Sequence, residues 1–226
     1  MILITGASRG LGKYIFDKYN TFDEKNVYGT SNNTQVEGIP NIVKVDITDF
    51  KSVENWILSI DNIKDITLIN CAGLSYNSFA HKAEPELWKK VIEVNLIGTF
   101  NCIRAVLPLM RQQKYGRIIN FSSVVPKKPT PGVSAYSASK SALWGLTKSI
   151  SAEVGSLNIT INNINIGYVN IGMGIEQVPP EYQEVIKKQI PSGRFCEPDE
   201  IFDTVEFLRN TPYVNGASID INGGLV

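Results

Sequence analysis

The stretch ILITGASRGLG, residues 2–12, carries the strongest indication of fold class in the chain. Its first residues are apolar and β-forming, and they run directly into a turn that holds Gly6, Gly10 and Gly12. Behind the turn, residues 14–19 place apolar side chains at helical spacing. A strand, a glycine turn and a helix in this order predict the first βα unit of an α/β fold.

The alternation of strands and helices continues to the end of the chain. Besides residues 2–5, strand patterns cover residues 26–30, 41–47, 66–73, 116–123, 159–167 and 217–223. Helical patterns cover residues 50–60, 86–113, 134–156 and 198–210. The strands are near-continuous Ile, Val and Leu runs, which indicates burial on both faces, as in a parallel sheet. We predict one doubly wound α/β domain over residues 1–226, with a seven-stranded parallel sheet and helices on both faces.

Three segments depart from regular alternation. The helical stretch 86–113 is expected to bend or break near Gly98. Residues 30–42 are few and rich in Asn, Pro and Gly, so their crossover helix is expected to be missing or reduced to a turn. Residues 172–191 read as a loop-rich segment with helical pieces.

Composition and charge narrow the function classes. Hydrophobic residues make up 43% of the chain and charged residues 19%, which is typical of an ordinary globular protein. The 22 basic and 22 acidic residues cancel, so no net field attracts nucleic acid or an anionic membrane. The N-terminus lacks the pattern of a signal peptide, and no apolar stretch is expected to reach the roughly 20 residues that span a bilayer. We therefore expect a cytoplasmic protein with no nucleic-acid or membrane partner.

The cysteines and the histidine do not indicate a disulfide framework or a metal site. Cys71, Cys102 and Cys196 are odd in number, far apart and without a CxxC pair, which favours free thiols in a reducing compartment. His81, the only histidine, has no second ligand or acidic partner in its motif, and we interpret it as a surface residue.

The spacing of the glycine turn, GxxxGxG, suits a nucleotide pyrophosphate. The phosphates need a tight turn, a close approach of the backbone, and free N–H groups with a favourable dipole at the start of a helix. A glycine-rich turn without a ligand is the alternative for an isolated match. The position of this turn, directly after the first strand of an α/β domain, favours a nucleotide.

The end of the second strand indicates which nucleotide is bound. An acidic side chain there accepts hydrogen bonds from the ribose 2′-hydroxyl of NAD and repels a 2′-phosphate. This chain has Thr30, Ser31 and Asn32 instead. Arg9, in the glycine turn, can supply a cation to a 2′-phosphate. We therefore predict NADP as the cofactor, with NAD as the alternative.

Four polar residues are candidates for chemistry. Tyr136 and Lys140 lie four positions apart, so on a helix they share a face, and a nearby ammonium lowers the pKa of a phenol toward neutral pH. Ser123, at the end of a predicted strand, can hydrogen-bond a substrate oxygen. Asn95 lies near the break in the long helix, where it can hold a water that links Lys140 to solvent. Taken singly, each residue is better explained by packing or solvation.

Taken together and in order, these pieces resemble the short-chain dehydrogenase/reductase family over nearly the whole chain. The matching pieces are TGASRGLG (5–12), VDITD (45–49), NCAG (70–73), VNL (94–96), FSSV (121–124), YSASK (136–140), NINIGYV (163–169), GRFCEPDEI (193–201) and VNGASIDINGG (214–224). The Tyr-xxx-Lys motif combined with the glycine turn is highly specific. Within the family, the motifs are most similar to those of the 3-oxoacyl-(acyl-carrier-protein) reductases.

The resemblance implies a Rossmann-type fold and gives each candidate a role. It makes Tyr136 the catalytic acid or base, and Lys140 the group that lowers the pKa of Tyr136 and holds the nicotinamide ribose. It makes Ser123 the residue that orients the substrate, and Asn95 the residue that completes the proton relay. With the glycine turn and the end of the second strand, it implies that the cofactor is bound by Gly6, Ser8, Arg9, Gly10, Leu11, Gly12, Ser31, Asn32, Asp46, Ile47, Asn70, Cys71, Ala72, Gly73, Tyr136, Lys140, Gly167 and Val169.

Three residues depart from the family pattern. Cys71 replaces an Asn whose contact is through the backbone, so little effect is expected. Ile166 stands in place of a Pro, and Ile171 in place of a Thr that typically hydrogen-bonds the nicotinamide carboxamide. The loss of that hydroxyl is expected to affect the affinity for the cofactor and not the class of cofactor.

The expected activity is hydride transfer with NADP(H) that interconverts a carbonyl and a secondary alcohol, with a 3-oxoacyl thioester as the first choice of substrate. A sugar, polyol or nucleotide-sugar substrate is the alternative within enzymes. A further alternative is a catalytically silent nucleotide-binding sensor of the same fold. The presence of all four candidate residues, Asn95, Ser123, Tyr136 and Lys140, argues against this alternative. The small-molecule or carrier-bound carbonyl is expected under residues 172–191.

Two kinds of macromolecular contact are also expected. An acidic carrier protein would need a basic rim, for which the candidates are Lys114, Arg117, Lys127 and Lys128. The resemblance further implies a homo-oligomer, a dimer or a tetramer, built through helices around residues 98–114 and 137–155.

Overall fold

The computed structural model describes all 226 residues except 24–25, 33, 35–37, 40, 129 and 177. Seven strands of the described chain form one parallel sheet in the order β3-β2-β1-β4-β5-β6-β7. They are β1 (Ile2–Thr5), β2 (Val27–Ser31), β3 (Ile42–Lys44), β4 (Thr67–Asn70), β5 (Gly116–Ser123), β6 (Ile159–Ile166) and β7 (Ser218–Ile221). The predicted seven-stranded parallel sheet is confirmed.

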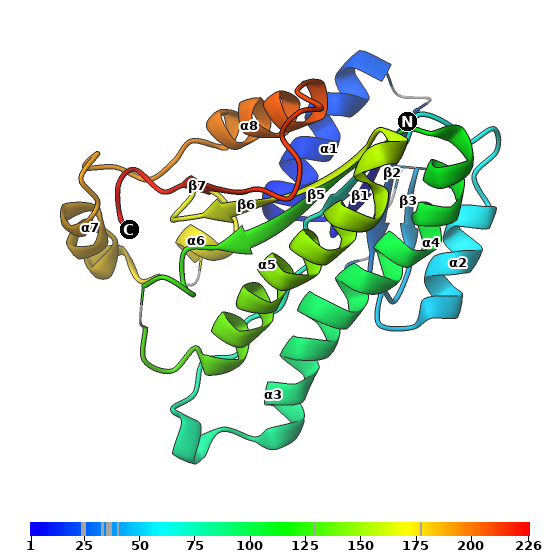
Figure 1. The fold of residues 1–226 in the computed structure, drawn as a ribbon. Coiled ribbons are helices and arrows are strands. Elements are labelled where there is room, and N and C mark those ends of the chain that lie inside the picture. Colours follow the sequence, from blue (N-terminus) through cyan, green and yellow to red (C-terminus); the bar gives the residue numbers. More distant parts are fainter. Residues whose placement is uncertain (24–25, 33, 35–37, 40, 129, 177) are drawn as a thin grey trace.

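Helices cover both faces of the sheet (Figure 1), as predicted. One face carries α1 (Gly10–Asp23) and α8 (Pro198–Asn210). The other carries α2 (Phe50–Leu58), α4 (Thr99–Gln113) and α5 (Ser134–Val154). Alternate residues of a strand pack against the two different helix layers, because successive side chains of a strand point to opposite faces. Leu3 thus packs in the α2 and α4 layer, whereas Ile2 and Ile4 pack in the α1 and α8 layer.

The long helical stretch is interrupted, as predicted. It consists of α3 (Pro85–Ile92), a π-helical segment η3 (Glu93–Gly98) and α4. A Cβ on Gly98 would lie 2.7 Å from Cδ1 of Ile47, so only glycine lets the helix come this close to the segment after β3. The π segment also carries the candidate residue Asn95.

The same run, Pro85–Gln113, is long and apolar enough by composition to cross a membrane, contrary to the sequence expectation. Four of its residues, Cys102, Ile103, Val106 and Met110, are buried in the core under the sheet. Packing against β4, β5 and α2 therefore accounts for its apolar face.

The segment after β2 differs in part from its prediction. The predicted strand 41–47 is shorter, because β3 ends at Lys44. The described residues between β2 and β3 form no helix, whereas residues 33, 35–37 and 40 of that prediction lie outside the described part of the chain. The predicted loop-rich segment 172–191 contains the short α6 (Met173–Glu176) and α7 (Pro180–Gln189).

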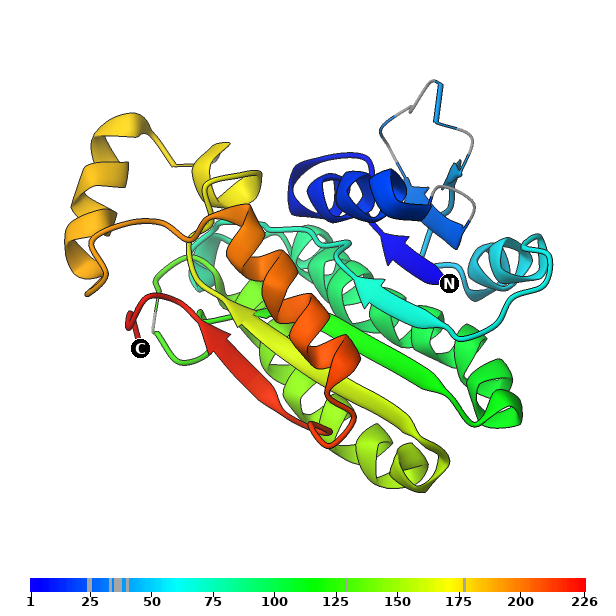
Figure 2. The same cartoon turned by 90° about the horizontal axis from the view of Figure 1, so that it is seen from above.

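All strands run the same way, so their carboxyl ends meet at one edge of the sheet. Figure 2 shows the strand arrowheads of β5, β6 and β7 pointing toward the end where α6 and α7 lie. The glycine turn after β1, the NCAG segment after β4, Ser123 at the end of β5 and Gly167 after β6 therefore share this edge. Open α/β sheets bind ligands at such an edge, where the strand order reverses.

Candidate active site

The glycine turn fits against the segment after β4 with no room for side chains. Gly6 has a φ of 69°, and a Cβ on it would lie 2.8 Å from the Cα of Ala72. A Cβ on Gly12 would lie 2.2 Å from the carbonyl oxygen of Gly6. Because neither position tolerates a side chain, the start of α1 presents bare backbone at the point where β1 and β4 separate.

Gly10 connects the glycine turn to the segment that follows β6. A Cβ on Gly10 would lie 3.3 Å from the Cα of Gly172, and Gly172 itself has a φ of 65°. The two backbones touch, so the segment 172–191 starts directly on the glycine turn. The proposed nucleotide end and the proposed substrate end of the site are thereby brought together.

The ends of β1, β2 and β3 also converge. The Ala7 N–H donates to the Thr30 carbonyl (2.8 Å), and the Val45 N–H donates to the Ser31 carbonyl (2.8 Å). The buried Ser31 hydroxyl donates to the Thr34 carbonyl, so it is directed into the turn after β2 and not toward a ligand. Arg9 is exposed, and its carbonyl accepts from the Lys13 N–H (3.2 Å). Its side chain makes no hydrogen bond or ion pair with the part of the chain that the structure describes.

Three further residues that were predicted to contact the cofactor lie beside this edge. Asp46 is exposed, and one of its carboxylate oxygens accepts hydrogen bonds from the N–H and the hydroxyl of Thr48 (2.9 and 2.7 Å). Ile47 is buried beneath Gly98. Asn32 is exposed at the end of β2.

The NCAG segment joins the glycine turn to the catalytic candidates. The Ala72 N–H donates to the Thr5 hydroxyl (3.1 Å), which fixes the segment against the end of β1. Asn70 is buried, and its amide donates to Asn120 (2.8 Å), while its own Oδ1 has no partner in the described chain. A Cβ on Gly73 would lie 3.6 Å from Oδ1 of Asn95 and 3.8 Å from Nζ of Lys140.

Tyr136, Lys140 and Ser123 come together as predicted. Tyr136 and Lys140 lie on one face of α5, and the Lys140 Nζ is 5.7 Å from the centroid of the Tyr136 ring. Ser123 ends β5 and hydrogen-bonds the Tyr136 phenol. The Val125 N–H donates to the Ser123 Oγ (3.2 Å), so the serine hydrogen is left to be donated toward the phenol or a substrate oxygen.

The electrostatics of Tyr136 differ from the expectation. Burial raises the pKa of the Tyr136 phenol above its ordinary value, and the hydrogen bond from Ser123 offsets only part of the rise. The expected lowering of this pKa by Lys140 is wrong for this structure, because burial sets the direction of the shift and only the Ser123 hydrogen bond opposes it. The phenol is therefore protonated at neutral pH, which is the form of an acid that donates a proton.

Lys140 is buried between α5 and β5. Its Nζ donates to the carbonyl oxygen of Phe121 (2.6 Å). Burial lowers the pKa of Lys140 to about 8, and the neighbouring Cys71 opposes this shift weakly. Cys71 itself is held as a thiol, because burial raises its pKa. At neutral pH most Lys140 side chains carry the proton, because neutral pH is about one unit below this pKa. The pKa is close enough to neutral pH for the side chain to exchange a proton.

Asn95 holds two parts of the site together. Its Oδ1 accepts from the Leu74 N–H (2.7 Å), and its Nδ2 donates to the Leu74 carbonyl (2.9 Å) and to the Ser139 hydroxyl (3.0 Å). The side chain is fully buried. It therefore joins the segment after β4 to α5, next to Lys140. The proton-relay role of Asn95 stays a prediction.

The residues after β6 are arranged against the C-terminal strand. The Gly167 N–H donates to the Ile221 carbonyl (2.9 Å), and a Cβ on Gly167 would lie 3.0 Å from the Cα of Asn222. Val169 is buried and forms a parallel bridge with Cys196. Ile171 packs half-buried against the apolar cluster beneath α1 and α8.

Sequence reasoning missed three groups of this site. They are the Phe121 carbonyl that accepts from Lys140, the Val125 N–H that orients Ser123, and the Ser139 hydroxyl that accepts from Asn95. Two of them are backbone groups, which no residue pattern reveals. Ser139 had a signal, because it is a polar residue on the buried face of the predicted helix, next to Lys140.

The residues at this edge fit a nicotinamide dinucleotide. The bare backbone at Gly6 and Gly12 leaves space that a Cβ would fill, at the N-terminus of α1, where a pyrophosphate is stabilised. The groups that would face the nicotinamide end are Tyr136, Lys140 and Gly167. Such a cofactor supplies or accepts a hydride.

Comparisons with known proteins agree with this geometry. A family model described as short chain dehydrogenase matches residues 1–181. The chain is 31% identical over 231 residues to the 3-oxoacyl-[acyl-carrier-protein] reductase FabG of Rickettsia prowazekii, covering 99% of this chain and 95% of the relative. It is 32% identical over 242 residues to the protein of the same name from Staphylococcus aureus strain Mu50, covering 99% and 96%.

Solved structures show the same likeness. The crystal structure of 3-oxoacyl-[acyl-carrier protein] reductase from Brucella melitensis matches with a TM-score of 0.87 and 32% identity, covering 99% of this chain and 90% of that one. A putative gluconate dehydrogenase from Agrobacterium tumefaciens matches with a TM-score of 0.90 at 24% identity, covering 100% and 95%, and shares the fold alone. The chain therefore belongs to the short-chain dehydrogenase family and is an oxidoreductase.

Proposed function

We propose that this protein uses NADPH to reduce the carbonyl of a 3-oxoacyl thioester to a secondary alcohol. The observation that carries the proposal is the group formed by Ser123, Tyr136 and Lys140 at the edge of the sheet, next to the glycine turn. The raised pKa of Tyr136 supports the direction of reduction, because a protonated phenol can donate to the carbonyl oxygen.

Each residue has a defined part in this proposal. The Ser123 hydroxyl accepts one hydrogen bond from the Val125 N–H and donates its hydrogen to the substrate oxygen, where it stabilises the charge that develops. Tyr136 donates its proton to the same oxygen, and Lys140 stabilises the phenolate that remains. Asn95 keeps the segment after β4 in contact with α5 while this takes place.

The choice of substrate rests on the relatives and on two basic side chains. The FabG relatives are named as reductases of 3-oxoacyl groups on acyl-carrier protein. Lys127 and Lys128 follow Ser123 on the same edge, and Lys128 donates to Gln189 at the end of α7 (3.1 Å). Arg117 and Lys114 are wrong as rim candidates, because they lie at the opposite end of β5, where Arg117 is buried.

A panel of carbonyl substrates tests the proposed activity. NADPH oxidation is measured with acetoacetyl-coenzyme A, a 3-oxoacyl carrier protein, a keto sugar and a simple ketone, each also with NADH. We expect the thioesters to be turned over with the highest kcat/KM. A keto sugar that exceeds both thioesters would replace the substrate class, and no oxidation with any carbonyl would support the silent sensor instead.

Arg9→Gln is expected to weaken NADPH binding about fivefold to tenfold and to leave NADH binding within twofold. Arg9 is exposed and follows Ala7, whose N–H bonds Thr30 at the end of β2, where a 2′-phosphate would lie. One phosphate–cation contact near a surface is worth on the order of 1 kcal/mol. Equilibrium titration of cofactor fluorescence with each nucleotide measures both constants. An equal loss for NADPH and NADH would remove the basis for preferring NADP.

Ile171→Thr is expected to tighten cofactor binding about fivefold. The hydroxyl would add one hydrogen bond, worth about 1 kcal/mol, at the segment that starts on the glycine turn. Because Ile171 packs against the cluster beneath α1 and α8, the variant should also unfold at a lower temperature. Unchanged affinity would show that backbone contacts alone hold the carboxamide.

A homo-oligomer in the cytoplasm completes the proposal. Ile97 and Phe100 are 45% and 43% exposed on the helical run that the resemblance places at an interface. Burial of such side chains between two copies is favourable, because apolar area is removed from water. Light scattering after size exclusion gives the state directly, and a monomer at micromolar concentration would exclude the proposed dimer or tetramer.

A further inference from the structure

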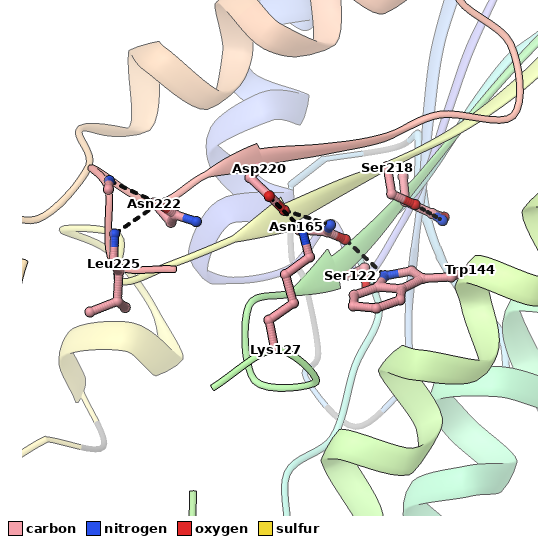
Figure 3. Close-up of polar contacts among 10 residues, drawn as sticks. Ser122, Lys127, Trp144, Asn165, Ser218, Asp220, Asn222 and Leu225 are labelled. Atoms are coloured by element: carbon pink, nitrogen blue, oxygen red, sulfur yellow. Dashed lines mark hydrogen bonds and ion pairs between the residues drawn. The ribbon is translucent and has the colours of Figure 1, made fainter. Parts of the chain in front are cut away.

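A series of polar contacts lies beside the end of β5 (Figure 3), and apart from the rim candidate Lys127 its residues have no role in the site described above. The Trp144 indole N–H points at both the Ser122 Oγ (3.1 Å) and the Asn165 Oδ1 (2.9 Å). The Asn165 amide donates to Asp220 (2.8 Å), and Asp220 pairs with Lys127. Lys127 lies on the loop that follows Ser123, and Ser122 directly precedes Ser123. The two ends of the series, Ser122 and Lys127, therefore flank the candidate catalytic serine in the chain.

The chemistry of the partners allows only one direction for these bonds. An indole N–H and an ammonium are donors only, and a carboxylate is an acceptor only. Asn165, between Trp144 and Asp220, must therefore present its oxygen to the indole and its amide to the carboxylate. Asn165 is fully buried, so a residue that lacked either group would leave a polar partner unsatisfied.

The series also connects the two elements that carry the catalytic group. The Ser122 hydroxyl donates to the carbonyl oxygen of Lys140 (3.1 Å), which joins β5 to α5 at the catalytic lysine itself. Trp144 lies one turn further along α5, and the Lys127 ammonium lies 5.7 Å from the centroid of its ring. Strand β6 with Asn165 and strand β7 with Asp220 therefore support both β5 and α5 from the side.

We propose that Asn165 and Asp220 are positioning residues that act through Trp144, Ser122 and Lys127 to hold the Ser123 hydroxyl in register with Tyr136. Neither residue touches the substrate. Their effect is geometric, since a displacement of a catalytic group by about 1 Å can cost on the order of a hundredfold in rate. This inference rests on the proposed reduction of a carbonyl for its kinetic readout, but not for its second readout below.

Asn165→Leu tests the centre of the series, and Asp220→Asn tests its exposed end. Leucine has a similar size and removes both hydrogen bonds, and we expect kcat with acetoacetyl-coenzyme A to fall about tenfold. KM and the NADPH dissociation constant should stay within about twofold. Asp220→Asn keeps an acceptor for Asn165 and loses the charge that Lys127 pairs with, so we expect a fall of about threefold. Asp220 and Lys127 are partly exposed, at 33% and 39%, so this variant should fold even if Asn165→Leu does not.

The pH dependence separates positioning from general destabilisation. Because the Ser123 hydrogen bond lowers the pKa of Tyr136, a displaced serine raises that pKa, and the kcat/KM profile should move to higher pH in Asn165→Leu. In a Ser123→Ala background, Asn165→Leu should cause no further movement. The groups that face Tyr136 among the described residues, Lys140 on α5 and, through it, Cys71 after β4, are unchanged in both variants.

Asn162→Leu is the matched control. Asn162 is a buried asparagine of the same strand, and its side chain bonds the Val214 carbonyl (2.8 Å) and the Ala217 N–H (2.9 Å), away from β5. We expect a comparable loss of stability with unchanged kcat and pH profile. Equal falls in kcat for Asn162→Leu and Asn165→Leu would overturn the proposal, as would a shift of the Asn165→Leu profile that persists without the Ser123 hydroxyl.

A readout without substrate keeps this test independent of the proposed function. The tyrosinate absorbance of each protein is titrated with pH, and subtraction of the matching Tyr136→Phe protein isolates Tyr136. We expect the Tyr136 pKa to be higher in Asn165→Leu than in the native chain and unchanged in Asn162→Leu. If no carbonyl is reduced by the native protein, the proposed function fails, and this titration alone decides on the positioning role, with an unchanged Tyr136 pKa overturning it.

Discussion

Replacement of Tyr136 by phenylalanine is expected to lower the rate of NADPH oxidation by about three orders of magnitude, since general acid catalysis contributes on the order of a hundredfold to ten-thousandfold. Only the hydroxyl is removed, so the ring still fills the space between Lys140 and Ser123. The dissociation constant for NADPH is expected to stay within about twofold. Steady-state kinetics and cofactor titration measure the two quantities on the same preparation.

A tyrosine outside the site provides the control. Tyr19, on α1, is 6% exposed and donates its hydroxyl to Glu206, beside Ile2 and Val27 at the amino ends of β1 and β2. Tyr19→Phe therefore removes the same atom away from the candidate active site, and it should lower stability while leaving kcat unchanged. Substantial turnover by Tyr136→Phe would remove the assignment of the acid, and equal losses in both variants would show that the effect is structural.

Lys140→Met is expected to abolish turnover and, at pH 7, to stabilise the fold by about 1–2 kcal/mol. Burial lowers the pKa of Lys140 from 10.5 to about 8. Each pKa unit corresponds to about 1.4 kcal/mol, so the buried charge costs about 3 kcal/mol below pH 8. Methionine fills a similar volume without charge, so the variant avoids this cost. The variant also leaves the Phe121 carbonyl without its hydrogen bond, which destabilises it by about 1–2 kcal/mol and reduces the net gain.

The advantage of Lys140→Met depends on pH in a defined direction. Between about pH 8 and pH 10.5 the unfolded native chain binds a proton at Lys140 that the folded chain does not, so native stability rises with pH. The difference between the variant and the native protein should therefore shrink across this window. Urea unfolding at pH 7 and near pH 10 measures it. A variant less stable than the native protein at pH 7 would contradict the stated cost of the buried charge.

Some parts of the site could be predicted because they depend on local sequence. The spacing of Tyr136 and Lys140 places them on one helix face, and the glycines after β1 meet steric limits that only glycine satisfies. The interruption of the long helix near Gly98 could also be predicted, because glycine has a low helix propensity and destabilises a helix where it occurs.

Other parts could not be predicted, because they depend on contacts between distant segments. The pKa of Tyr136 was expected to fall, and it rises, since the expectation counted the charge of Lys140 and could not include burial. Ser31 was expected to face a nucleotide, and its hydroxyl instead closes the turn after β2. Arg117 and Lys114 were expected at the rim, and they lie at the other end of β5, because the direction of a strand in the sheet is a tertiary property.

The α/β class, the glycine turn and the order of the reactive side chains can be predicted from the sequence alone, because each depends on residue type and spacing within one segment. The way in which these groups work together depends on contacts between distant segments. The tertiary structure placed the ends of β1, β4, β5 and β6 at one edge, buried Lys140 against the Phe121 carbonyl, and set Asn95 between Leu74 and Ser139. Burial and hydrogen-bond direction arise from residues far apart in the chain, and these two quantities control the acidity of Tyr136 and the orientation of Ser123.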